Sequence, residues 1–248
     1  MKNVVTVKEQ LTSGTNRRSF LKISGLTMAA TGLILTGCNN DDNSSAPTDN
    51  QLPGIRNGKF DLGAGDFGVL TYAYALEQLE ADFYTRVVNG NNFGSTFNAE
   101  ERQVLTDLYH HEVIHREFFK TALSGALPNP SSQLLPNLEF NYGALNFSNR
   151  LQVLNTAQAL EDTGVGAYNG AGYLIKTPDY LVLAGKIVSV EARHASAIRS
   201  LLNPNSNDFA GDNIVNASNG LDTSKKPSEI LSIAGGFITT PFTATFLP

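Results

Sequence analysis

The chain has 248 residues, of which 41% are hydrophobic and 17% charged, with a formal net charge of −5 and a single cysteine. Residues 1–37 carry five basic residues and one acidic residue, so the remaining 211 residues hold 13 basic and 22 acidic residues, a net charge of −9. Such an acidic chain has no electrostatic reason to bind nucleic acid. One cysteine excludes thiolate zinc sites and internal disulfides. The 211 residues are enough for one sizeable core.

The N-terminal segment has the features of a lipoprotein signal peptide, which we assign to residues 1–37. Residues 16–22 (NRRSFLK) resemble a twin-arginine export signal, and the apolar run that follows is short for a mature membrane anchor. The run ends in LTGC, which resembles a bacterial lipobox. We therefore expect a lipid on Cys38 that anchors the exported protein on the periplasmic side of the cell envelope. An uncleaved membrane anchor is the alternative. Residues 38–65 are rich in Asn, Asp, Ser, Pro and Gly and predict a flexible tether.

A first helix is predicted from about residue 66 to residue 88, because apolar residues recur there every three or four positions. Glu77 lies within this apolar stripe, Glu80 follows one turn later, and Tyr84 lies seven residues after Glu77.

A second helix is predicted from residue 98 to about residue 123, with Asn98 as the N-cap and Glu101 at the capping-box position. The polar residues at its centre include His111, Glu112 and His115. Residues 126–147 contain three prolines and predict one long connection to the second half of the chain.

The third predicted helix has Ser148 as its N-cap and carries Glu161 and Tyr168, at the same spacing as Glu77 and Tyr84. It is rich in glycine, and these small residues are expected to allow close approach of a neighbouring helix. The fourth begins at Thr177-Pro178, ends near residue 203 and carries Glu191 and His194.

The chain thus contains Glu, Glu-x-x-His, Glu and Glu-x-x-His in order, a weak repeat of one helical hairpin. A spacing of three places each Glu and His on one helix face. Carboxylates inside apolar stripes are costly unless they are paired, protonated or bound to cations. The pattern predicts four carboxylates and two imidazoles around two divalent or trivalent cations. A metal-free polar network is the alternative, provided that every member is hydrogen-bonded.

These residues resemble the ferritin-like di-iron and di-manganese carboxylate bundles, and in particular the secreted ferritin-like proteins similar to the desiccation-related family. The resemblance implies an all-α, ferritin-like four-helix bundle over residues 66–203 with one long crossover. It implies the metal ligands Glu77, Glu112, His115, Glu161, Glu191 and His194, with Glu112 and Glu191 as bridges. The residues expected beside these ligands are Tyr84, Tyr168, His111 and Glu80. Glu80 competes with Glu77 for the ligand position, and His111 is either an extra ligand or a hydrogen-bond donor to one.

Carboxylate and imidazole ligands suit iron or manganese, so we expect two iron or manganese ions. The resemblance implies a ferroxidase, or a peroxide-consuming, catalase-like oxidoreductase. The alternative is a non-catalytic, stress- or desiccation-associated envelope protein with a structural or vestigial metal site. Residues 204–248 are expected to form an irregular extension that packs on the bundle, with a short helix over 228–238 and an extended end. This extension does not resemble the fifth helix of cage-forming ferritins, so we do not expect a storage cage. A smaller homo-oligomer is compatible with the sequence.

Overall fold

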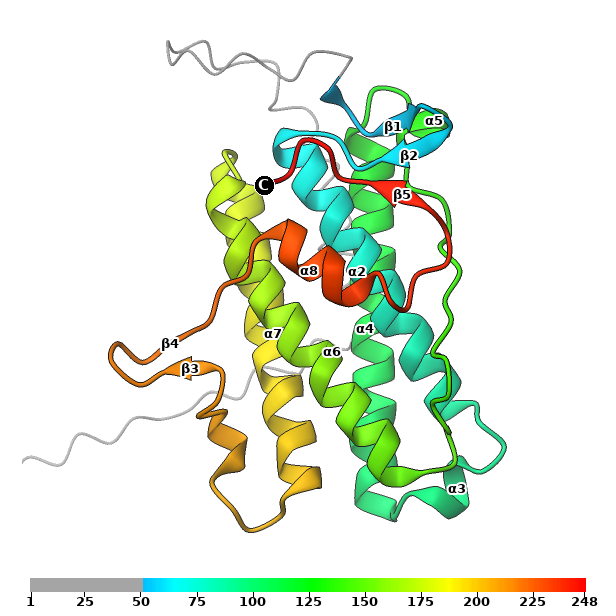
Figure 1. The fold of residues 1–248 in the computed structure, drawn as a ribbon, viewed down its shortest axis with the longest axis vertical. Coiled ribbons are helices and arrows are strands. Elements are labelled where there is room, and N and C mark those ends of the chain that lie inside the picture. Colours follow the sequence, from blue (N-terminus) through cyan, green and yellow to red (C-terminus); the bar gives the residue numbers. More distant parts are fainter. Residues whose placement is uncertain (1–50) are drawn as a thin grey trace, which may run out of the picture. The chain divides into compact units, whose positions relative to one another are not determined.

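Four long helices form the bundle in the computed structural model, which describes residues 51–248 (Figure 1). These helices are α2 (Gly65–Val88), α4 (Ala99–Ala126), α6 (Arg150–Ala171) and α7 (Pro178–Leu202). Short helical turns accompany them: α3 (Phe93–Thr96), α5 (Pro130–Gln133) and the 3-10 helix η2 (Gly172–Leu174). The helices pair as two antiparallel hairpins, α2 with α4 and α6 with α7. The predicted all-α bundle is confirmed.

The helix starts follow local capping chemistry. The side chain of Asn98 accepts a hydrogen bond from the Glu101 amide at 3.0 Å, and the Glu101 carboxylate accepts one from the Asn98 amide at 2.9 Å. This reciprocal pair is the predicted capping box. Helix α6 is capped one residue later than predicted, because Asn149 and not Ser148 accepts the bond from the Gln152 amide.

The long crossover runs back along the length of the bundle between α4 and α6 (Figure 1). It packs on α2, where the Leu138 amide donates to the Gln78 side chain at 2.8 Å and the Tyr142 hydroxyl donates to the Leu79 carbonyl at 3.1 Å. Helix α2 is therefore buried on almost every side. This burial explains why its sequence is apolar around most of its circumference.

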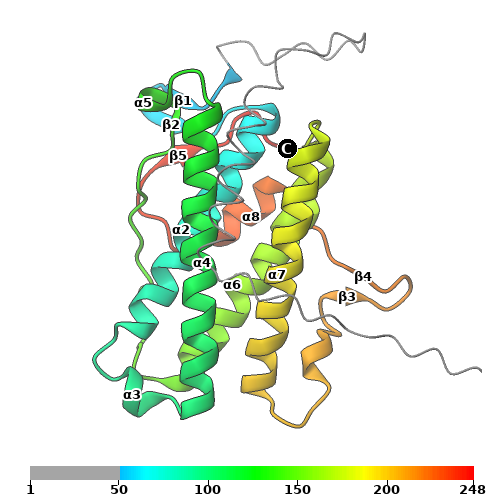
Figure 2. The ribbon, with the colours of Figure 1, turned by 180° about the vertical axis from the view of Figure 1, so that it is seen from behind.

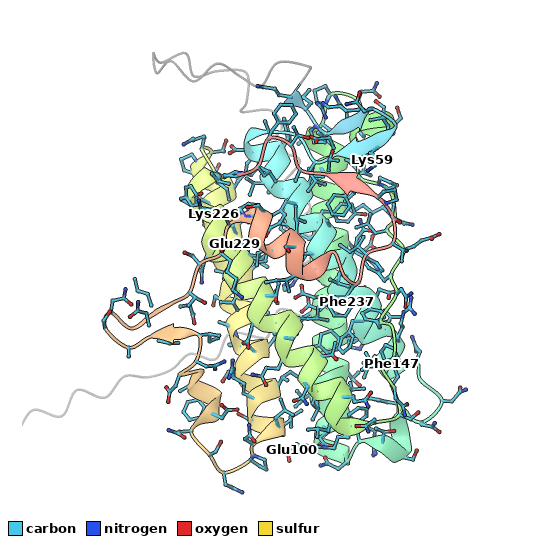
Figure 3. The ribbon with its side chains drawn as sticks, in the orientation of Figure 1. Lys59, Glu100, Phe147, Lys226, Glu229 and Phe237 are labelled. Carbon is cyan, nitrogen blue, oxygen red and sulfur yellow. The ribbon has the colours of Figure 1, made fainter. Side chains whose placement is uncertain are left out.

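An aromatic cluster joins the crossover to the C-terminal extension. The Tyr142 ring lies 5.7 Å from the Phe147 ring and 5.6 Å from the Phe237 ring. Phe147 and Phe237 are labelled in Figure 3, where both lie beside α2 and α6. Aromatic contacts at this distance stabilise the packing beyond the area that they bury.

The residues just before α2 differ from the predicted tether. Strands β1 (Gly54–Arg56) and β2 (Lys59–Asp61) pair antiparallel, and β5 (Phe242–Thr243) adds to β2 in parallel. Phe60 and Leu62 are buried, so apolar contacts and a strand from the far end of the chain order this segment. The predicted signal peptide, Cys38 and the first part of the tether lie outside the described residues.

The rest of the C-terminal extension comprises η3 (Asp208–Ala210), the hairpin of β3 (Val215–Asn216) and β4 (Leu221–Asp222), and α8 (Pro227–Ala234). Helix α8 lies across α2 and α6, and from the opposite side it lies behind α4 and α7 (Figures 1 and 2). Within residues 51–248, no helix has both the length and the apolar character needed to cross a membrane.

The glycines of α6 allow two close approaches. One comes from a neighbouring helix, as predicted, because the Glu80 side chain of α2 lies against Gly164. The other comes from the extended segment before α8, which touches the α6 backbone. The Lys225 amide donates to the Gly166 carbonyl at 3.0 Å. A Cβ atom on Gly170 would lie only 1.7 Å from the Lys225 carbonyl oxygen.

Candidate metal centre

The four long helices bring the six predicted ligands together in the interior of the bundle. Helix α2 supplies Glu77, α4 supplies Glu112 and His115, α6 supplies Glu161, and α7 supplies Glu191 and His194. All six side chains are buried. Each helix presents these residues on its inward stripe, because a spacing of three or four residues returns to the same face.

The first group of donor atoms surrounds His115. Its Nδ1 atom lies 2.9 Å from Glu191 Oε1, 3.3 Å from Glu77 Oε2 and 3.4 Å from Glu112 Oε2. One ligand atom from each of these four residues lies within 4.8 Å of the others. Four oxygen and nitrogen donors at such separations can bind one cation.

The second group has the same composition and surrounds His194. Its Nδ1 atom lies 2.8 Å from Glu112 Oε1, 3.3 Å from Glu191 Oε2 and 3.4 Å from Glu161 Oε2. These four residues also offer ligand atoms within 4.8 Å of one another. Glu112 and Glu191 belong to both groups and direct one carboxylate oxygen to each. These two carboxylates are thus shared by the two groups.

Within the described residues the donor atoms of the two groups make no hydrogen bond of normal geometry, and only imidazole–carboxylate ion pairs of 2.8–3.4 Å join them. The eight atoms are Glu77 Oε2, both carboxylate oxygens of Glu112 and of Glu191, Glu161 Oε2, and Nδ1 of His115 and of His194. A buried polar group without a partner costs about 1–3 kcal/mol, and more when it is charged. A metal-free polar network would need these atoms to be hydrogen-bonded. Their arrangement is compatible with a di-metal site.

Two tyrosines fix the outer oxygens of the terminal carboxylates. Tyr84 on α2 donates a hydrogen bond to Glu161 Oε1 on α6 at 2.5 Å. Tyr168 on α6 donates to Glu77 Oε1 on α2. Each of these glutamates therefore has one oxygen held by a tyrosine and the other directed into the centre. Such outer partners orient metal ligands.

Burial controls protonation in the centre. It raises the pKa of Glu112 to about 8, and the charge of Glu191 adds to this effect. Burial also raises the pKa of Glu161 to about 7, although the neighbouring His194 opposes the shift. Burial disfavours the ionised form of Glu191 too, but contacts with the two imidazoles outweigh it and lower the pKa to about 2. Protons thus compete with cations for these sites.

The imidazoles respond to the same charges in the opposite direction. Burial lowers the pKa of His115, but the charge of Glu77 and the contacts with Glu112 and Glu191 outweigh it, so the net effect is a raised pKa. The pKa of His194 is raised by Glu161, Glu112 and Glu191 against the same effect of burial.

His111 and Glu80 lie beside the centre and outside both donor groups. His111 is exposed on α4, and its Nδ1 atom lies 2.9 Å from Nε2 of His194. Glu80 is buried one turn after Glu77 and points toward α6. Glu77, and not Glu80, thus belongs to a donor group, and His111 contacts His194 from outside both groups.

The role of Gly164 was not predicted, but the sequence repeat accounts for it. Aligning Glu77 with Glu161 and Tyr84 with Tyr168 places Gly164 opposite Glu80. A Cβ atom on Gly164 would lie 2.9 Å from Glu80 Oε1. The missing side chain in the second half therefore makes room for the additional carboxyl of the first half. The alignment alone could have identified this pair.

Fold and site together define a four-helix-bundle protein with a buried carboxylate and histidine centre able to accept two metal ions. A family model described as a ferritin-like domain matches residues 65–204, more than half of the chain. The chain therefore belongs to the ferritin-like domain family. A comparison with curated proteins gives no match.

Proposed function

We propose that the protein binds two iron or manganese ions and uses them for two-electron redox chemistry, oxidising Fe(II) or consuming hydrogen peroxide. The observation that supports this proposal is the pair of donor groups, whose eight buried atoms have no other hydrogen-bond partner. Hard carboxylate oxygens with one imidazole nitrogen per ion favour iron and manganese over metals that prefer sulfur ligands.

The residues of the centre have distinct parts in this chemistry. When bound, the two ions supply an acceptor and donor of two electrons. Glu112 and Glu191 would each supply one carboxylate oxygen to both ions, while His115 and His194 would each provide a nitrogen donor to one of them. Tyr84 and Tyr168 keep the terminal carboxylates in place. The bundle core surrounds the centre and restricts access of bulk water.

Export and lipid attachment belong to the same proposal. A twin-arginine pathway carries folded proteins, which agrees with metal insertion before export, and Cys38 would then hold the domain at the envelope. Incorporation of labelled fatty acid into the native chain, and its loss in Cys38→Ser, tests this part by itself.

The metal centre is tested by elemental analysis of the protein exported by its native host. We expect two iron or manganese ions per chain, loss of both in Glu112→Ala, and nearly unchanged occupancy in Glu80→Ala, since Glu80 lies outside both donor groups. An empty centre in Glu80→Ala would contradict the assignment. Peroxide loss and Fe(II) oxidation by the loaded protein then test turnover. Tight metal without either reaction would instead support a structural metal in a stress-associated envelope protein.

A further inference from the structure

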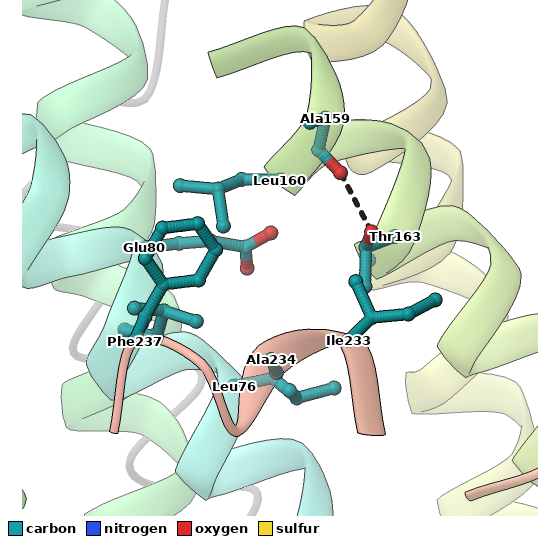
Figure 4. Close-up of a pocket in the computed structure, with 10 residues that line it drawn as sticks. Leu76, Glu80, Ala159, Leu160, Thr163, Ile233, Ala234 and Phe237 are labelled. Atoms are coloured by element: carbon teal, nitrogen blue, oxygen red, sulfur yellow. Dashed lines mark hydrogen bonds between the residues drawn. The ribbon is translucent and has the colours of Figure 1, made fainter. Parts of the chain in front are cut away.

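A small cavity lies between α2, α6 and the C-terminal helix α8 (Figure 4), and its wall includes Leu76 and Leu160, the residues that precede Glu77 and Glu161 in the sequence. Its volume is about 30 Å³. Apolar side chains form most of the wall, and the two polar groups are the carboxyl of Glu80 and the hydroxyl of Thr163. Residues of the C-terminal extension, including Ile233, Ala234 and Phe237, close one side. The extension therefore completes this cavity.

Glu80 is the unexplained group in the cavity. Its side chain is 3% exposed, and within residues 51–248 it makes no hydrogen bond or ion pair. Figure 4 shows its carboxyl directed into the cavity, between Leu160 and Ile233. A buried carboxyl is unfavourable without a partner, so a ligand in the cavity would satisfy a group that the protein leaves unsatisfied.

The glycine opposite Glu80 keeps this space available. A methyl group on Gly164 would lie 2.9 Å from Glu80 Oε1, closer than side chains pack. Replacing this glycine would therefore displace the carboxyl or fill the cavity. Gly185 on α7 provides a matched control, because a Cβ atom added there would have nothing within 4 Å.

The polar groups define what the cavity can bind. Burial, followed by the charges of the neighbouring carboxylates, raises the pKa of Glu80 well above its usual value and so favours the neutral carboxyl, which can both donate and accept a hydrogen bond. The Thr163 hydroxyl donates to the Ala159 carbonyl at 2.6 Å, which leaves its oxygen free to accept. The cavity thus offers one donor and two acceptors in an apolar surrounding.

Size and hydrogen bonding select the ligand. A water molecule needs roughly 10–15 Å³ of such space, so the cavity accommodates about two oxygen atoms. Dioxygen would leave the carboxyl unsatisfied because it has no hydrogen to donate. Hydrogen peroxide has two O–H donors and oxygen lone pairs, which match the two acceptors and the one donor. Two water molecules share this chemistry.

We propose that the cavity between α2, α6 and α8 is a binding site for hydrogen peroxide, with Glu80 and Thr163 as its hydrogen-bonding residues. Its relevance to turnover rests on the proposed function, because the ions beside the cavity would be the reaction partner. Peroxide binding itself requires only the residues of this chain. The C-terminal extension is then part of a substrate site.

Infrared difference spectroscopy on the metal-free protein tests binding without turnover. Glu80→Gln identifies the carbonyl band of protonated Glu80 by its disappearance. We expect hydrogen peroxide to shift that band in the wild type and in Gly185→Ala, but not in Gly164→Ala. An unchanged wild-type band would mean that the cavity holds only water and would overturn the proposal, as would an equal shift in Gly164→Ala.

Steady-state kinetics of the metal-loaded protein provide an independent measurement. Thr163→Val keeps the side-chain volume and removes one acceptor, so we expect KM for peroxide to rise about 3–10-fold, with kcat and metal content unchanged. Turnover with an unchanged KM would refute the peroxide site and leave the proposed function standing. A band shift without any turnover would support the site and refute peroxide consumption.

Discussion

The two proposed metal positions differ in their surroundings, because His111 contacts His194 in one donor group and not His115 in the other. Its Nδ1 atom lies 2.9 Å from Nε2 of His194, and the two ring planes are within 12° of parallel with their centroids 5.1 Å apart. For Nδ1 of His194 to coordinate a cation, the ring proton must lie on Nε2 and be donated to His111. Within residues 51–248, His115 has no comparable ring partner on its outer nitrogen.

The substitution His111→Ala therefore perturbs one ion position and spares the other. Loss of an outer hydrogen-bond partner of a metal-binding histidine weakens metal affinity about 10–100-fold. Because His111 is exposed, we expect the lower end, about tenfold or roughly 1.4 kcal/mol, at the position of His194. The affinity at the position of His115 should remain unchanged.

Calorimetric titration of the metal-free protein with Mn(II) resolves the two positions. The matched control is His110→Ala, since His110 is the adjacent exposed histidine on α4 and contacts only the Tyr109 ring among the described ring contacts. His111→Gln should restore affinity, because a glutamine oxygen can accept the same proton. Equal weakening of both positions, or an identical effect of His110→Ala, would refute the reasoning.

Three further predictions concern the packing of the Lys225 segment on α6, the hydrogen bonds of Asp61 on β2, and the pH dependence of metal affinity. Gly170→Ala should destabilise the protein by about 1–3 kcal/mol in denaturant unfolding, because the new methyl overlaps the Lys225 carbonyl, whereas Gly125→Ala, with free space around it, should stabilise by about 0.5–1 kcal/mol. Equal effects would contradict the packing argument. Burial opposes ionisation of Asp61, but hydrogen bonds from Thr243, Thr245 and Gly63 outweigh it and lower its pKa. Its contribution is therefore fully present above the unfolded pKa of about 3.9 and is lost as pH falls through the folded value. Asp61→Ala should cost about 1.5–3 kcal/mol at pH 7 and much less near pH 2, and a pH-independent cost would count against this account. Because the pKa of Glu112 is raised to about 8, metal affinity should fall as pH drops from 8 to 6 while more protons are released per ion, which calorimetry in buffers of different ionisation enthalpy measures.

Several elements could be predicted from local sequence because their causes are local. The capping box of Asn98 and Glu101 involves residues three apart, and the structure contains it. The inward position of Glu112 and His115 follows from helical periodicity in the same way. In contrast, residues 52–62 looked like a tether because their partner strand, β5, lies some 180 residues away in the chain.

The glycines of α6 show the same limit. Composition indicated close approach to the helix but not what approaches it. The structure shows the Lys225 segment at Gly166 and Gly170, and the Glu80 carboxyl at Gly164. These contacts depend on how the C-terminal extension crosses the bundle, which no spacing within α6 encodes.

By itself, the sequence determined that four amphipathic helices carry one glutamate or one Glu-x-x-His pair each, because helical periodicity decides which residues share a face. Only the tertiary structure decided that Glu77 and not Glu80 reaches the centre, that His111 touches one histidine, and that α8 closes a cavity beside it. Those outcomes depend on the distances between helices, and side chains from different helices meet only when the bundle packs.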